Sequence, residues 1–138
     1  MPKTVLLIDS QMAARRMLRF AMELYEYRVV ELADASGAQA ALTGNCPDLL
    51  VIGINASDAG QQTLLSQLRQ QPAFALLPVL LVGENRCRPR WDLRTIGNCA
   101  WLDKPFCMGE FHHLVDTLLA PSRLPLPRST AARDERPG

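Results

Sequence analysis

Five short strand-like segments, most of them aliphatic runs, recur along the chain, with segments of helical character between them. The predicted strands are Thr4–Ile8, Arg28–Ala33, Asp48–Gly53, Leu77–Gly83 and Cys99–Asp103. A continuous apolar run without alternation is typical of a strand that is buried on both faces of a parallel sheet. The five predicted helices are one that opens at Asp9-Ser10, Ser36–Thr43, Gln61–Gln70, one within Pro89–Gly97, and Met108–Leu119. This alternation predicts an α/β fold with helices on both faces of the sheet.

Apolar residues at helical spacing predict which faces of the helices pack on the sheet. In the first helix this stripe comprises Ala14, Met17, Leu18, Ala21 and Leu24. Its arginines, Arg15, Arg16 and Arg19, lie mostly off the stripe and are expected to be solvated. We expect Gly44 to end the second helix as a C-cap. On the last helix His112 and His113 point about 100° apart, so we expect two surface histidines without a shared site.

Composition bounds the size and class of the protein. The chain has 138 residues with a formal net charge of +1, which fits one domain and excludes binding of nucleic acid by net charge alone. The segment Pro121–Gly138 has four arginines, two acidic residues and few large apolar groups. We therefore predict one folded domain at 1–120 and a disordered tail at 121–138, which is either inert or an extended ligand for a partner.

The cysteines and the apolar segments indicate the compartment. Cys46, Cys87, Cys99 and Cys107 form no C-x-x-C pair, so we expect reduced thiols and no zinc site. No apolar run approaches the ~20 residues that a membrane helix needs, and no secretory signal is visible. These features predict a cytoplasmic protein that does not bind a membrane.

Residues with chemical potential stand where the predicted strands end. Asp9 and Ser10 follow the first strand, Gly53 ends the third, Gly83 ends the fourth, and Lys104 follows the fifth. The carboxyl ends of parallel strands share one edge of the sheet, and ligands of such folds bind there. This edge is therefore where a functional site is expected.

The chain resembles the receiver (CheY-like) domain of bacterial two-component response regulators over about residues 3–120. The resemblance is carried by four segments that occur in order: Val5–Asp9, Pro47–Ile52, Leu77–Val82 and Lys104-Pro105-Phe106. It implies a doubly wound sheet of five parallel strands in the order 2-1-3-4-5, with five helices in two layers. The family transfers a phosphoryl group to an aspartate, using magnesium held by carboxylates together with a hydroxyl and a lysine.

Carried over to this chain, the family pattern is incomplete. Asp9 matches the first acidic position and Lys104 the lysine, whereas Ser10 replaces the second acid, Gly53 the acceptor aspartate and Gly83 the hydroxyl residue. Glycine has no side chain to phosphorylate, and one carboxylate beside a neutral hydroxyl makes a poor magnesium site. The pattern therefore indicates a degenerate receiver without catalytic residues or a cofactor, with Asp9 as a residual ion candidate.

Three hypotheses concern what this altered pocket does. If the family alignment slips, Asp48 or Asp58 replaces the missing acceptor, although both lie away from the expected position. The preferred alternative is an ion pair between Asp9 and Lys104 that fills the vacated space, with Glu84 also near the lysine. A small anion beside Lys104 is a further alternative, because the two glycines leave room.

An arginine-rich segment and an aromatic residue mark a candidate interaction face. Its residues are Arg86, Arg88, Arg90, Arg94 and Trp101. In the resembled family the position of Trp101 reports phosphorylation to the surface formed by the fourth helix, fifth strand and fifth helix. Without a hydroxyl at Gly83 that signal is lost, so Trp101 is either packed inward or an exposed binding anchor.

These observations predict a non-enzymatic, stand-alone adaptor that acts by protein–protein interaction independently of phosphorylation. The resemblance suggests a histidine kinase, a phosphotransfer domain or another receiver as its partner, and a homodimer is an additional option. One alternative is an active receiver that uses a non-standard aspartate in a phosphorelay. The other is a nucleotide- or nucleic-acid-binding module that uses the Arg86–Arg94 cluster, which is less favoured because aromatic residues are scarce there.

Overall fold

The molecule is built on a single parallel sheet. The computed structural model describes residues 3–55, 61–88 and 97–120. The strands are β1 (Thr4–Ile8), β2 (Arg28–Leu32), β3 (Leu49–Ile54), β4 (Val79–Glu84) and β5 (Cys99–Lys104). They pair in the order β2-β1-β3-β4-β5, and every pair is parallel. The predicted α/β fold and strand order are confirmed.

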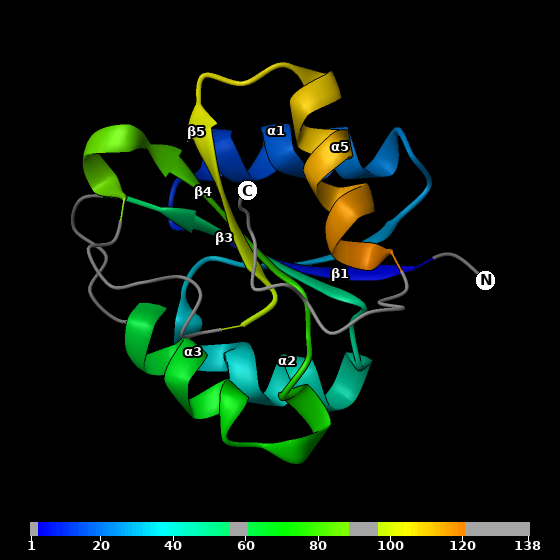
Figure 1. The fold of residues 1–138 in the computed structure, drawn as a ribbon, viewed down its shortest axis with the longest axis vertical. Coiled ribbons are helices and arrows are strands. Elements are labelled where there is room, and N and C mark those ends of the chain that lie inside the picture. The colour runs from blue at the N-terminus through cyan, green and yellow to red at the C-terminus, as the bar shows by residue number, and fades with distance from the viewer. Residues whose placement is uncertain (1–2, 56–60, 89–96, 121–138) are drawn as a thin grey trace, which may run out of the picture.

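Helices cover both faces of the sheet and complete three layers (Figure 1). One layer contains α1 (Met12–Glu23) and α5 (Met108–Leu119), and the opposite layer contains α2 (Ala38–Asn45) and α3 (Gln61–Arg69). Short 3₁₀ turns lie at Ala35–Gly37, Pro72–Phe74 and Asn85–Cys87. No helix within the described ranges is both long and apolar enough to span a bilayer.

The alternation of side chains along each strand divides the core into two parts. Val5 and Leu7 face α1 and α5, whereas Leu6 and Ile8 face α2 and α3. All six residues of the central strand β3 are buried. This burial on both faces explains the continuous apolar runs from which the strands were predicted.

The buried face of α1 differs from the predicted stripe. Leu18, Ala21 and Met22 are buried, but the side chains of Met17 and Leu24 are 48% and 54% exposed. The helix begins at Met12 rather than at Asp9-Ser10, and its orientation is set by contact with the sheet. An apolar side chain at the margin of that contact stays exposed although its spacing is helical.

The prediction that Arg15 is solvated was wrong. Its side chain is only 18% exposed and forms an ion pair with Glu31 on β2, with Nε to Oε1 at 3.1 Å. Its Nη1 also donates to the backbone carbonyl of Asp9 at 2.8 Å. The residue thus ties α1 to the ends of two strands, a long-range contact that helical spacing does not predict.

Other predicted helix boundaries differ from the observed ones by a few residues, or fall on residues outside the described part of the chain. Gly44 does not end the second helix, because α2 continues to Asn45 and Cys46 adopts the left-handed conformation with φ 46°. The fourth predicted helix falls on residues 89–96, and the predicted tail on 121–138; both lie outside the described residues. The last helix has the bounds predicted for it.

His112 is not a surface residue, contrary to the prediction. It is 5% exposed and its ring stacks on Tyr25. Burial lowers the pKa of His112, with the carboxylate of Asp116 opposing that shift. The residue therefore packs as a neutral ring where α5 meets the end of α1.

Candidate functional site

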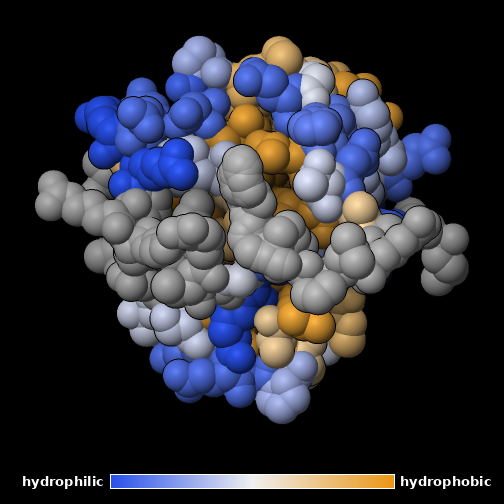
Figure 2. Space-filling view, viewed as in Figure 1, coloured by the Kyte–Doolittle hydropathy of each residue, from blue (hydrophilic) through white to orange (hydrophobic). Residues whose placement is uncertain are grey.

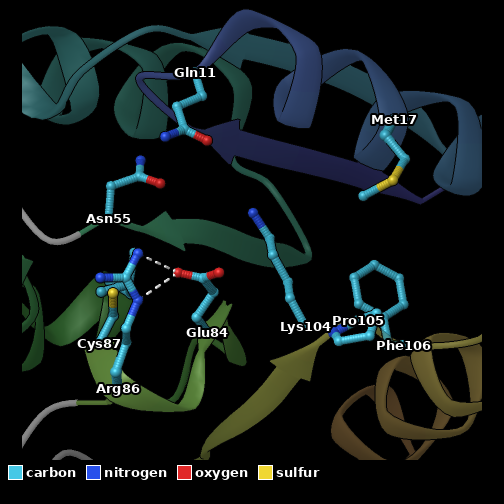
Figure 3. A pocket seen from close by; sticks show the side chains of 10 residues that line it. Gln11, Met17, Asn55, Glu84, Arg86, Cys87, Lys104, Pro105 and Phe106 are labelled. Atoms are coloured by element: carbon cyan, nitrogen blue, oxygen red, sulfur yellow. Dashed lines mark hydrogen bonds and ion pairs between the residues drawn. The ribbon is translucent and has the colours of Figure 1, made fainter.

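Polar side chains from several strand ends meet at the carboxyl edge of the sheet, the edge at which the sequence predicts a site. They surround a cavity of about 750 Å³, shown in Figure 3 and called the edge cavity below. Its lining within the described residues comprises Gln11, Met17, Ile54, Asn55, Glu84, Arg86, Cys87, Lys104, Pro105 and Phe106. The sequence analysis did not identify Asn55 or Gln11 as site residues, although each lies within three residues of the end of a strand.

Asp9 turns its carboxylate into the interior. The residue is 1% exposed, and Oδ1 accepts hydrogen bonds from the backbone N–H of Gln11 at 2.9 Å and from Nδ2 of Asn55 at 3.4 Å. The other oxygen, Oδ2, has no hydrogen-bond partner within the described residues. An unpartnered buried carboxylate oxygen is costly, so its position requires a structural reason.

The reason lies at Gly53, the position that matches the acceptor aspartate. A Cβ atom built on Gly53 would lie 2.0 Å from Oδ2 and 2.4 Å from Cγ of Asp9. Both distances are far inside van der Waals contact. The carboxylate of Asp9 therefore occupies the space where a side chain at position 53 would begin.

The groups that donate hydrogen bonds to the carboxylate of Asp9 are neutral. The Oγ of Ser10 accepts from Nδ2 of Asn55 at 2.9 Å. No group of three or more potential metal ligands occurs among His, Cys, Asp and Glu in the described part of the chain. Magnesium requires several hard oxygen ligands in octahedral geometry. The single carboxylate of Asp9, turned onto Gly53, does not fit that requirement.

Gly83 is closely covered on two sides. A Cβ atom there would lie 2.7 Å from the carbonyl oxygen of Ile54 and 3.0 Å from Cη2 of Trp101. The indole of Trp101 is half-buried, packs against the core on the side of α2 and α3, and donates from Nε1 to Oδ1 of Asp103 at 2.5 Å. Trp101 is thus a half-buried aromatic on the edge strand β5, between the two predicted alternatives.

The predicted ion pair between Asp9 and Lys104 is not formed. Within the described residues the side chain of Lys104 makes no hydrogen bond or ion pair. Glu84 pairs with Arg86 instead, at 2.7 Å from Oε1 to Nη2, and this contact raises the pKa of Arg86. Lys104 extends from the end of β5 into the edge cavity, between Asn55 and Phe106 (Figure 3).

The fold agrees with that of known signalling proteins. The chemotaxis protein CheY4 of Vibrio cholerae matches with a TM-score of 0.76 at 21% identity, over 86% of this chain and 100% of that one. A putative response regulator from Chloroflexus aurantiacus matches with a TM-score of 0.74 at 25% identity, over 88% of this chain and 100% of that one. This chain has the CheY-like receiver fold.

Sequence comparison adds one curated relative. No family model matches the chain. The probable transcriptional regulatory protein TcrX of Mycobacterium tuberculosis is 27% identical over 110 residues, which cover 79% of this chain and 46% of that protein. The chain thus spans about half the length of the curated relative that it matches.

Of the two alternative acceptor aspartates, the structure describes Asp48 but not Asp58. Asp48 precedes β3, at the opposite edge of the sheet from the edge cavity, and its Oδ2 accepts from the backbone N–H of Thr4 at 2.8 Å. It is therefore a strand length away from Lys104. Asp58 lies outside the described residues.

The candidate interaction face is only partly described. Arg86 and Arg88 are exposed, and Arg86 is engaged by Glu84. Arg90 and Arg94 fall within residues 89–96, outside the described part. Elsewhere, several large apolar side chains are exposed on or just after α1, among them Phe20 at 63%. Figure 2 shows hydrophobic surface between hydrophilic patches in the upper half, where Figure 1 places α1 and α5.

Proposed function

We propose that this chain is a non-catalytic signalling adaptor with a receiver fold, which acts through protein–protein interaction and independently of phosphorylation. The observation that carries the proposal is the position of Asp9 against Gly53. The acceptor position has no side chain, and the carboxylate of Asp9 lies within 2.0 Å of where one would begin. An aspartate at position 53 would collide with the residue that, in the receiver pattern, helps to hold magnesium.

The environment of Gly83 supports the same proposal. Switching in receivers needs a hydroxyl at this position to respond to a phosphoryl group, as the family resemblance implies. Here the Cβ position is closed by the Ile54 carbonyl and the Trp101 ring. With Trp101 held by packing and by its bond to Asp103, the surface around β5 presents one arrangement to a partner.

The fold suggests the class of partner. Proteins of two-component pathways that carry or contact receivers, namely histidine kinases, phosphotransfer domains and other receivers, are the partners we propose. A second copy of this chain is the further option. Arg86 and Arg88 are exposed near the end of β4, where they favour an acidic partner surface.

The first experiment measures phosphorylation directly. The full chain is incubated with acetyl phosphate and magnesium and analysed by intact mass. We expect no species heavier by about 80 Da, the mass of one phosphoryl group. A stoichiometric adduct of that mass would refute the proposal and favour the alternative acceptor, which peptide mapping would place at Asp48, Asp58 or elsewhere.

A second experiment tests binding. The tagged chain is used to capture partners from the source organism, in parallel with its Trp101→Ala variant and with Gln67→Ala, an exposed change on α3, as the matched control. We expect the wild-type chain and the control to enrich two-component proteins. The Trp101→Ala variant should enrich them less, because it removes the ring that keeps the surface around β5 in one arrangement. Recovery of nucleic acid with salt-sensitive binding would instead support the nucleic-acid alternative.

A further inference from the structure

The edge cavity has the size and composition of a small-molecule site. Its volume of about 750 Å³ lies within the range of roughly 300–1,000 Å³ typical of ligand pockets. Such pockets combine apolar walls with a few polar groups that fix orientation. In the edge cavity, one side of the lining is apolar and the other side carries the polar groups.

One wall of the cavity is apolar. Met17 from α1, Pro105 and Phe106 after β5, and Ile54 from β3 contribute to it. Figure 3 places Met17 beside Phe106 on one side of Lys104. The ring of Phe106 is fixed by stacking on Phe111, with centroids 5.7 Å apart. The part of this wall that Phe106 supplies is therefore preformed, which lowers the entropic cost of binding an apolar group there.

The opposite side supplies polar groups with one uncompensated charge. The charged residues that line the cavity within the described ranges are Glu84, Arg86 and Lys104. Glu84 and Arg86 neutralise each other, whereas the ammonium group of Lys104 has no partner in the described part of the chain. The amides of Gln11 and Asn55 face the same space (Figure 3).

We propose that the edge cavity binds a small organic carboxylate, with its anionic group on Lys104 and its apolar body against Met17 and Phe106. A carboxylate matches a single unpaired ammonium in charge, and the charge-assisted hydrogen bond gains strength in a partly enclosed site. A phosphate dianion fits less well, because its two negative charges would meet a single cation without an ion-pair partner among the described residues of the lining. This site goes beyond the proposed adaptor function and does not depend on it.

The test is a titration of the isotope-labelled full chain followed by two-dimensional NMR, with phenylacetate as the probe. Phenylacetamide has the same ring without the charge, acetate has the charge without the ring, and inorganic phosphate tests the anion alone. We expect phenylacetate to shift the amide signals of Gln11, Lys104 and Phe106 saturably. Each of the other three compounds should bind at least tenfold more weakly.

Two lysine variants distinguish binding at Lys104 from nonspecific electrostatic attraction of the probe. The chain has only two lysines, Lys3 and Lys104, and Lys3 is exposed just before β1, at the opposite edge of the sheet. Lys104→Met removes the ammonium group and keeps an unbranched side chain, and it should weaken phenylacetate binding at least tenfold, whereas Lys3→Met should leave it within twofold. The dispersion of the spectrum shows whether each variant is folded.

Four results would overturn the proposal. In the wild-type chain they are equal affinity for phenylacetamide, equal affinity for inorganic phosphate, and absence of saturable shifts. The fourth is unchanged affinity in folded Lys104→Met. Because neither phosphorylation nor partner capture is measured, failure here is distinguishable from failure of the adaptor proposal.

Discussion

Replacing Gly53 by alanine tests the central feature of the site, the carboxylate of Asp9 seated against a bare backbone. The added Cβ would lie 2.0 Å from Oδ2 of Asp9, whereas ordinary contact begins near 3.4 Å. The Asp9 side chain must therefore move by more than an ångström. Because Cγ would also lie only 2.4 Å away, a small displacement of one oxygen does not relieve the clash.

The size of the expected change in the free energy of unfolding follows from the hydrogen bonds that Asp9 would lose. Moving the carboxylate breaks the hydrogen bond from Gln11 at 2.9 Å and the longer one from Asn55 at 3.4 Å. A hydrogen bond to a charged group contributes ~1.5–3 kcal/mol, and release of the unpartnered Oδ2 from burial offsets part of that loss. We expect Gly53→Ala to lower the free energy of unfolding by about 1–2 kcal/mol.

The assay is urea unfolding followed by circular dichroism, arranged as a double-mutant cycle with Asp9→Ala. In the Asp9→Ala background Oδ2 and Cγ are removed and only Cβ of residue 9 remains, 3.1 Å from the added Cβ, so Gly53→Ala should change stability by less than ~1 kcal/mol in either direction. Gly44→Ala is the matched control, because Gly44 lies in α2 with nothing within 4 Å of its Cβ position. It should stabilise by ~0.5–1 kcal/mol. Equal effects of Gly53→Ala in both backgrounds would refute the reasoning.

Three further predictions concern other parts of the molecule. Gly83→Ser should destabilise by ~1–3 kcal/mol in the same assay, because its Cβ would lie 2.7 Å from the Ile54 carbonyl. Stability should fall as the pH drops below 6.5, the ordinary pKa of histidine, because the lowered pKa of buried His112 makes the unfolded chain bind more protons than the folded one. Urea unfolding at several pH values should show that the stability of His112→Phe depends less on pH. Burial raises the pKa of the Cys99 thiol to about 12, so mass spectrometry at pH 8 should show alkylation of exposed Cys46 well before Cys99.

The strands and most helices could be predicted because their signals are local. The apolar runs at Thr4–Ile8 and Leu49–Ile54 follow from burial on both faces, and α5 follows from its helical periodicity. The position of Gly53 at the end of β3 was also predictable, since a strand of known direction fixes which residue reaches the edge. These features depend on neighbours in sequence.

Residues whose roles depend on distant contacts were predicted less well. Met17 and Leu24 have helical spacing but remain exposed, and His112 is buried because Tyr25 lies against it. Arg15 is held by Glu31, which is sixteen positions away in sequence. In each case the packing angle between elements decided the outcome, and periodicity within one element carries no information about that angle.

The sequence by itself determined the sheet order implied by the receiver resemblance, and it placed Asp9, Gly53, Gly83 and Lys104 at one edge. It also determined that no side chain at position 53 can accept a phosphoryl group. Only the tertiary structure decided that Asp9 turns onto Gly53 and leaves Lys104 without a partner in the described residues. The physical reason is that a short carboxylate takes the nearest vacant space and the nearest N–H donor, and both are created by strands and loops that meet only in the folded chain.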